Sequence, residues 1–249
     1  MTFAKANVLR KIPTGPNPVI WDYKQLLGSK LRAAWDVRVG GEFDDGVWVS
    51  HTDVVSGIRV EAPTPAQRPL AQVDGSNFRG RRAIRLTAAG PRKMVTQAMP
   101  DVVPVNTRPE VFMVARLPSG VTPSGNLCGC ANALADPRAG ASFWTNGSAL
   151  NGVAAGATSV AYADTTGVHL FSAFADDTQS RLLIDNVQVA TGALDTTLFA
   201  TTQAAIGGFA TGYIVTNDAF AALWGICCPA MTSEERAQFF AIARADWGF

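Results

Sequence analysis

Short apolar runs, separated by Gly, Pro, Asn and Asp, make up the chain from Trp35 onward. Residues 110–116 are rich in β-branched and aromatic side chains and are followed by a turn-forming segment at 118–120. In residues 167–174, successive side chains of a strand would point to opposite faces, with Val168, Leu170 and Ser172 on one face and His169, Phe171 and Ala173 on the other. Both patterns predict strands of a packed sheet, and their spacing is typical of a sandwich or jelly roll.

The strongest local signal is a tight hairpin over residues 181–189. Asp185 and Asn186 stand between two apolar runs and can adopt the positive φ angles that a two-residue type I′ turn requires. Two further apolar runs, 203–208 and 220–228, predict the later strands.

One segment near the end of the chain predicts a helix. Thr232 and Glu235 form a capping box, in which the hydroxyl and the carboxylate satisfy the first free N–H groups. Gly248 is placed to end the helix. Between them, apolar side chains recur at spacings of three and four and predict a stripe that docks on the sheets: Phe240, Ala243 and Trp247.

The first 34 residues differ in composition from the rest of the chain. They are basic, are interrupted by prolines and contain at most one short helix near residues 23–27. Through Arg38, seven basic residues face two acidic ones, which gives +5 and leaves −4 for the remainder. We therefore expect a basic anchoring arm over residues 1–34 and one β-sandwich domain over residues 35–249.

Composition narrows the classes of function. The chain is 47% hydrophobic and only 16% charged, where about 25% charged is usual, so its surface suits lasting burial against partners. A net charge of +1 argues against a dedicated nucleic-acid binder. No apolar segment follows Met1, and no apolar run approaches the roughly 18 residues of a membrane helix. We expect a protein made in the cytoplasm, without membrane insertion.

The order of the later elements resembles LamG/concanavalin A-like domains. In many of these, a strand–Asp-Gly–strand hairpin precedes an apolar Gly-x-Ile strand and a helix that opens with Leu/Met-Thr/Ser-x-x-Glu-Arg and closes with Trp-Gly. Here the hairpin at 181–189, the strands at 206–208 and 221–226, and the helix at 231–248 follow that order. Segments similar to the family's front half are 31–36, 48–57, 66–69 and 77–86.

This resemblance implies an all-β fold: a concanavalin A-like jelly-roll sandwich of two antiparallel sheets with one C-terminal helix. Asn186 stands where the family's hairpin has Gly, and residues 118–164 match nothing in the pattern. Domains of this type with an added arm look like virion proteins of tailed phages, such as tail fibres, receptor-binding tips or capsid decorations. Fold alone does not fix function.

The resemblance predicts a non-enzymatic structural or binding component of a phage-like particle. We expect a virion location, a homo-oligomer with a trimer favoured, contacts with other virion proteins, and recognition of host surface carbohydrate. A free carbohydrate-binding adhesin and a polysaccharide depolymerase on the same fold are the alternatives.

Sugar binding requires an exposed aromatic platform with amide or carboxylate partners, and two segments offer one. Trp144 stands beside an Asn-Gly turn, which is equally compatible with a place in the core. The candidate carbohydrate-binding residues are Trp144, Asn146, Tyr162 and Asp164.

Basic residues gather in one segment as well as in the arm. Six of them fall between Arg79 and Lys93, where Asp and Glu are absent. This density could hold an acidic polysaccharide or an acidic capsid surface, and the alternative is a solvated strand face. The candidates for anchoring or polyanion contact are Lys5, Arg10, Lys11, Arg79, Arg81 and Arg82.

Catalytic groups are sparse. Laminarinase-type hydrolases on this fold use a Glu-x-Asp-x-x-Glu strand, whose two outer carboxylates serve as nucleophile and acid. The nearest match is Glu42 and Asp44, but Val47 occupies the position of the second Glu. We therefore interpret this segment as a solvated acidic turn. Only two histidines exist, and we expect both His51 and His169 to serve as hydrogen-bonding structural residues. No catalytic residue is predicted.

No metal site is predicted. The four cysteines lack zinc-ligand spacing and are expected to be buried strand residues: Cys128, Cys130, Cys227 and Cys228. No cofactor is predicted apart from calcium, which occurs in this family at loop carboxylates and carbonyls. The candidates by residue type alone are Asp164, Asp176 and Asp177, with ordinary turn roles as the alternative.

Overall fold

The computed structural model describes residues 20–53, 55–73, 77–86, 92–96, 108–117, 125–131, 140–146, 149–154, 157–161, 167–175, 179–193, 203–208 and 219–249. Its helices are α1 (Ile20–Leu27), α2 (Ser233–Trp247) and the short 3-10 turns η1 (Gly28–Lys30), η2 (Pro65–Gln67) and η3 (Asn77–Gly80). Its strands are β1 (Leu31–Asp36), β2 (Gly41–Asp44), β3 (Val47–Thr52), β4 (Arg59–Glu61), β5 (Leu70–Val73), β6 (Arg82–Leu86), β7 (Met94–Thr96), β8 (Glu110–Arg116), β9 (Gly125–Ala131), β10 (Gly140–Asn146), β11 (Ala149–Ala154), β12 (Ala157–Ala161), β13 (Val168–Ala175), β14 (Gln179–Ile184), β15 (Val187–Ala193), β16 (Gln203–Ile206) and β17 (Ala219–Cys227).

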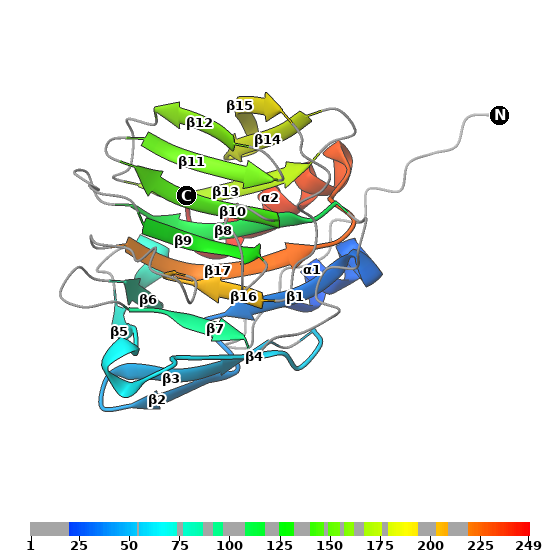
Figure 1. Cartoon of the computed structure of the whole chain (residues 1–249). Helices are drawn as coiled ribbons and strands as arrows, with labels where there is room; N and C mark the ends of the chain where they lie inside the picture. Colours follow the sequence, from blue (N-terminus) through cyan, green and yellow to red (C-terminus); the bar gives the residue numbers. More distant parts are fainter. Residues whose placement is uncertain are drawn as a thin grey trace.

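The strands form two sheets that face each other (Figure 1). The back sheet has the order β15–β14–β13–β8–β17–β1, with β6 beside β1 on the same edge of β17. The front sheet has the order β12–β11–β10–β9–β16–β7–β4–β3–β2, and β5 links β6 to β3. Every pairing in the described part of the chain is antiparallel. The predicted all-β sandwich of two antiparallel sheets with one C-terminal helix is confirmed.

Apolar side chains fill the space between the sheets. Trp35 of β1 and Trp224 of β17 are opposite each other in register, and their rings stack with centroids 4.0 Å apart. From the front sheet, alternate residues of β9 and β16 join the same core, namely Cys128, Cys130, Ala204 and Ile206. The four cysteines are all buried and free, as predicted.

Both α-helices lie on the outer side of the back sheet. The Phe239 ring of α2 packs against Phe112 of β8 and Tyr23 of α1, at centroid distances of 4.6 and 4.8 Å. The buried face of α2 therefore runs through Phe239, Ala243 and Trp247, whereas Phe240 is only partly buried. The predicted stripe was wrong at Phe240, because the helix is rotated so that its neighbour Phe239 faces the sheet.

The predicted local signals are confirmed where the structure describes them. Asp185 and Asn186 have φ angles of 51° and 64°, as the type I′ hairpin between β14 and β15 requires. Thr232 accepts a hydrogen bond from the Glu235 N–H, the Glu235 carboxylate accepts from the Thr232 N–H, and Gly248 ends α2 in the left-handed conformation.

Residues 20–34, which the sequence pattern places in the arm, are packed onto the sandwich. Tyr23 and Leu27 of α1 are buried in the main core, and β1 begins at Leu31. Lys5, Arg10 and Lys11 lie outside the described residues. No helix in the described part of the chain is long and apolar enough to span a membrane.

Candidate functional site

The alternation of side-chain direction along its strands defines which face of the front sheet points away from the main core. Cys128 and Ile206 are a register pair whose side chains lie in the main core, so their strand neighbours belong to the opposite face. Those neighbours include the pair Gly129 and Ala205, and Ala205 packs with Val95 in a separate small cluster. We call this side of the sheet the outer face.

Strand β10 places two predicted site residues on the outer face. Phe143 is opposite Cys128 and so belongs to the core side, which puts Trp144 and Asn146 on alternating positions of the outer face. The backbone register places position 144 on the outer face, whereas the Trp144 side chain lies outside what the structure describes. Tyr162 and Asp164, the other two candidates, lie outside the described residues.

Pairing across the sheet adds two amides that sequence reasoning missed. Trp144 is opposite Asn126 of β9 on one side and Asn151 of β11 on the other. These residues are 18 and 7 positions away in the sequence. No short motif links them, and only the strand register could have found them.

The other end of the outer face carries ionised side chains. Glu42 of β2 accepts a 2.6 Å hydrogen bond from Ser50 Oγ and forms an ion pair with Arg59 Nη2 at 2.9 Å. Arg59 also lies 3.6 Å from Glu61. The hydrogen bond from Ser50 makes the largest contribution to lowering the pKa of Glu42 below its ordinary value, and the positive charge of Arg59 adds to it.

Glu42 is therefore poorly suited to the role of general acid in a glycosidase. A glycosidase general acid needs a raised pKa so that it is protonated at working pH. The pKa of Glu42 is lowered instead. Asp44 is exposed at the end of β2, and its Oδ2 lies 3.3 Å from Arg68 Nη1. Both carboxylates neutralise arginines on the surface of the β2–β3 hairpin.

The predicted polyanion residues divide into two kinds. Arg81 is used internally, because it donates a 2.9 Å hydrogen bond to the Asp246 carbonyl and its guanidinium lies 5.5 Å from the Trp247 ring. Arg82 lies 4.5 Å from the ring of Phe43, one of the few large apolar side chains exposed in the described part of the chain. Arg79 is exposed beside Gly248.

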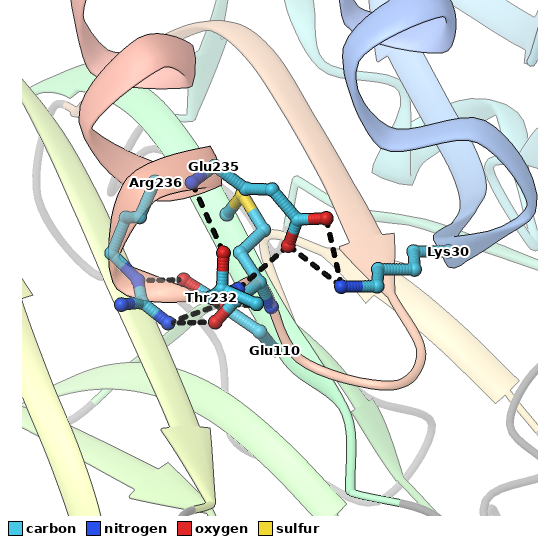
Figure 2. Close-up of polar contacts among 6 residues, drawn as sticks. Lys30, Glu110, Thr232, Glu235 and Arg236 are labelled. Carbon is cyan, nitrogen blue, oxygen red and sulfur yellow. Dashed lines mark hydrogen bonds and ion pairs between the residues drawn. The ribbon is translucent and has the colours of Figure 1, made fainter. Parts of the chain in front are cut away.

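A polar network at the start of α2 is structural (Figure 2). Arg236 and Glu110 form a buried two-point ion pair, with distances of 2.9 and 3.0 Å. Lys30 Nζ donates to both oxygens of Glu235 at 2.7 and 2.8 Å, and Glu235 also caps the helix at Thr232. These contacts fasten α2 to β8 and to η1, and their polar groups satisfy one another.

The histidines have the structural roles that the sequence predicts. The buried His51 makes a 2.7 Å hydrogen bond from Nε2 to the Val39 carbonyl, and burial lowers its pKa. His169 Nδ1 lies 2.7 Å from Asp185 Oδ2 in the hairpin. Within the described residues, no group of three or more His, Cys, Asp and Glu side chains could hold a metal ion. The calcium candidates Asp164, Asp176 and Asp177 lie outside them.

No protein-family model and no curated protein sequence matches this chain. Solved structures are similar in fold. The crystal structure of the receptor binding domain of botulinum neurotoxin C/D mosaic serotype has a TM-score of 0.58 at 10% identity, over 86% of this chain and 51% of that one. The botulinum neurotoxin serotype D binding domain gives 0.59 at 8% identity, over 88% and 52%.

A third similar structure is the binding domain of Paraclostridial Mosquitocidal Protein 1, with a TM-score of 0.57 at 11% identity, over 86% of this chain and 52% of that one. The chain therefore spans about half the length of the structures that it resembles. At these identities the likeness shows a shared β-sandwich fold. The matched structures are described as binding domains, not as catalytic ones.

Proposed function

We propose that this chain is a non-enzymatic binding domain that recognises carbohydrate on a host-cell surface through the outer face of its front sheet. The observation that carries the proposal is the register of β10, which places Trp144 and Asn146 together on that face. The fold shared with receptor-binding domains supports a binding role. The lowered pKa of Glu42, in the segment nearest to a hydrolase motif, opposes a role in acid catalysis.

The chemistry of these side chains suits a sugar. An indole ring presents a broad apolar surface to the C–H groups of a pyranose, and it loses little conformational entropy on binding. A side-chain amide both donates and accepts, as a hydroxyl group does, so it fixes the orientation of a sugar on the ring. One aromatic platform with convergent polar groups is the usual composition of a small-ligand site.

The test is a glycan array followed by affinity measurement with single variants of the full chain. Trp144→Ala should weaken binding of the strongest array ligand at least tenfold, whereas Trp144→Phe should retain most of the affinity because it keeps an aromatic ring. Thr145→Val, on the core side of the same strand, is the matched control. Equal affinity for native protein and Trp144→Ala would remove this face from the function.

The particle role predicted from the sequence is a second part of this proposal, and the position of α1 supports it. Tyr23 Oη donates a 3.1 Å hydrogen bond to Asp246, and Lys30 pairs with Glu235, so α1 and η1 are fastened to α2. The helix α1, with which the described part of the chain begins, thus lies on the helix side of the sandwich, opposite the outer face of the front sheet. This arrangement suits a protein anchored at one side and binding at the other.

Purified particles provide the test of the particle role. We expect the chain in stoichiometric amounts by mass spectrometry, a trimer by light scattering, and loss of incorporation when residues 1–19 are deleted. A chain absent from particles and monomeric in solution would overturn the particle role and leave a free adhesin.

A further inference from the structure

At one end of the sandwich, an exposed phenylalanine of the front sheet meets an exposed arginine of the back sheet. Among the described residues, Phe43 of β2 and Val187 are the large apolar side chains that are exposed, at 38% and 63%. The guanidinium carbon of Arg82, the first residue of β6, lies 4.5 Å from the Phe43 ring centroid. Strands β2 and β6 lie at the same end of the sandwich (Figure 1). The two side chains therefore form a contact that is open to solvent.

The Phe43 ring packs against a buried tryptophan. Phe43 and Trp48 are register partners, and their ring centroids are 4.0 Å apart. Because Trp48 is fully buried in the main core, Phe43 belongs to the core side of β2 and not to the outer face. A Cβ added at Gly41 would lie 2.1 Å from Trp48 Cζ3, so the backbone of β2 packs directly against the indole. Phe43 is thus held in place, on a different side of the front sheet from β10 position 144.

Arg82 has an uncompensated positive charge. Its side chain is exposed, and within the described part of the chain it forms no ion pair and donates no hydrogen bond. The carboxylates of β2 already have partners, because Glu42 pairs with Arg59 and Asp44 with Arg68. The N–H donors of Arg82 are therefore available to an acidic group from outside the chain.

The turn before β6 presents a second exposed arginine. Phe78 and Arg79 have φ angles of 49° and 55°, a left-handed conformation that is costly for both residues. Packing holds the turn, because the buried Phe78 ring makes an edge-to-face contact with Trp247 at 6.2 Å. A Cβ added at Gly248 would lie 3.0 Å from Arg79 Cγ and Nε, so the Arg79 side chain packs against the end of α2. Arg79 and Arg82 are thus presented by a backbone that is already ordered, which lowers the entropic cost of binding.

We propose that Phe43 and Arg82, with Arg79 as a second positive charge, bind a sugar that carries a carboxylate. This site goes beyond the proposed function, because it lies at the end of the sandwich and not on the outer face. A guanidinium binds a carboxylate through two parallel hydrogen bonds, and an aromatic ring packs against the apolar C–H groups of a pyranose. Glu42 and Asp44 repel an extended polyanion such as a nucleic acid, so the site suits one compact acidic group.

The experiment is an NMR titration of the isotope-labelled full chain with glucuronate and with glucose, which has the same ring without the carboxylate. We expect glucuronate to shift the amides around Phe43 and Arg82 and to bind at least about tenfold more tightly than glucose. An increase of NaCl from about 50 to 500 mM should weaken glucuronate binding several-fold, because salt screens contacts between exposed charges.

Single variants test the two side chains separately. Arg82→Gln should weaken glucuronate binding about tenfold, whereas Arg82→Lys should weaken it less, because lysine keeps the charge without the two-point geometry. Phe43→Leu keeps apolar bulk over Trp48 but removes the ring, and should weaken binding about threefold. Arg244→Gln is the matched control and should bind as the native chain does. Arg244 is also exposed, and it lies 6.0 Å from the Phe240 ring, but that ring is partly buried on α2.

Three results would overturn this site. The first is equal affinity for glucose and glucuronate, or native affinity in Arg82→Gln. The second is binding of a tetraglutamate peptide without binding of glucuronate, which would assign the pair to contact with an acidic protein. The third is a set of glucuronate shifts confined to β10 and the strands paired with it. None of these variants alters the outer face, so the loss of this site would leave the proposed function to its own test.

Discussion

Arg236 of α2 is joined to Glu110 of β8 by two parallel hydrogen bonds, and both side chains are almost completely buried. Arg236 also donates to the Met231 carbonyl at 2.6 Å, while Glu110 accepts from the Met231 N–H at 2.9 Å. The residues that precede α2 are thus held by the same pair that fastens the helix to the sheet.

Breaking this pair should be costly. Glu110→Gln leaves a buried guanidinium without its counter-charge, and we expect it to lower the free energy of unfolding by about 3–5 kcal/mol. Arg236→Met should have a similar effect, and the double variant should lose less than the sum of the two. Urea denaturation measures all three. A loss below about 1 kcal/mol for Glu110→Gln would show that the pair does not hold the helix.

The capping box gives a smaller and more local prediction. Thr232→Ala removes the side-chain acceptor for the Glu235 N–H and should destabilise the protein by about 1 kcal/mol. Thr232→Ser keeps the acceptor and should be close to native. Ser233→Ala, one residue further on and exposed, is the control. Equal loss at positions 232 and 233 would contradict a specific capping role.

His51 predicts a pH dependence of stability. Burial lowers its pKa in the folded protein, so the unfolded chain takes up the proton first as the pH falls. The free energy of unfolding should therefore decrease below about pH 6.5, the ordinary pKa of histidine. His51→Gln keeps a donor for the Val39 carbonyl but cannot titrate, so its stability should fall less between pH 6.5 and 5. Parallel pH profiles for the two proteins would disprove this assignment.

Tryptophan fluorescence tests the placement of Trp144. Four of the six tryptophans have exposures of 0 or 1%: Trp35, Trp48, Trp224 and Trp247. Acrylamide should therefore quench mainly Trp21 and Trp144, and Trp144→Phe should reduce the quenchable fraction. Bound glycan should protect the same fraction. An unchanged quenching curve for Trp144→Phe would place that indole away from solvent.

Local sequence patterns predicted the fold well because they depend on neighbouring residues. The type I′ turn at Asp185 and Asn186 and the capping box at Thr232 are examples, since a few adjacent side chains decide each of them. Periodicity was less decisive for α2, where Phe239 and Phe240 are adjacent and tertiary packing selected Phe239.

The candidate site was predicted only in part. Trp144 and Asn146 were proposed from residue type, whereas the positions of Asn126 and Asn151 opposite Trp144 follow only from the strand register. The roles of the arginines in the basic segment depend in the same way on tertiary contacts. Density along the sequence does not show that Arg81 is directed at the end of α2 while Arg82 lies over Phe43.

The most direct test of the central claim is an NMR titration of the isotope-labelled full chain with the glycan that gives the strongest array signal. We expect amide shift changes to gather on β10 and the strands paired with it, with the largest near Trp144 and Asn146. Changes centred instead on η3 and β6, around Arg79 and Arg82, or on β2–β4, around Glu42, would contradict it.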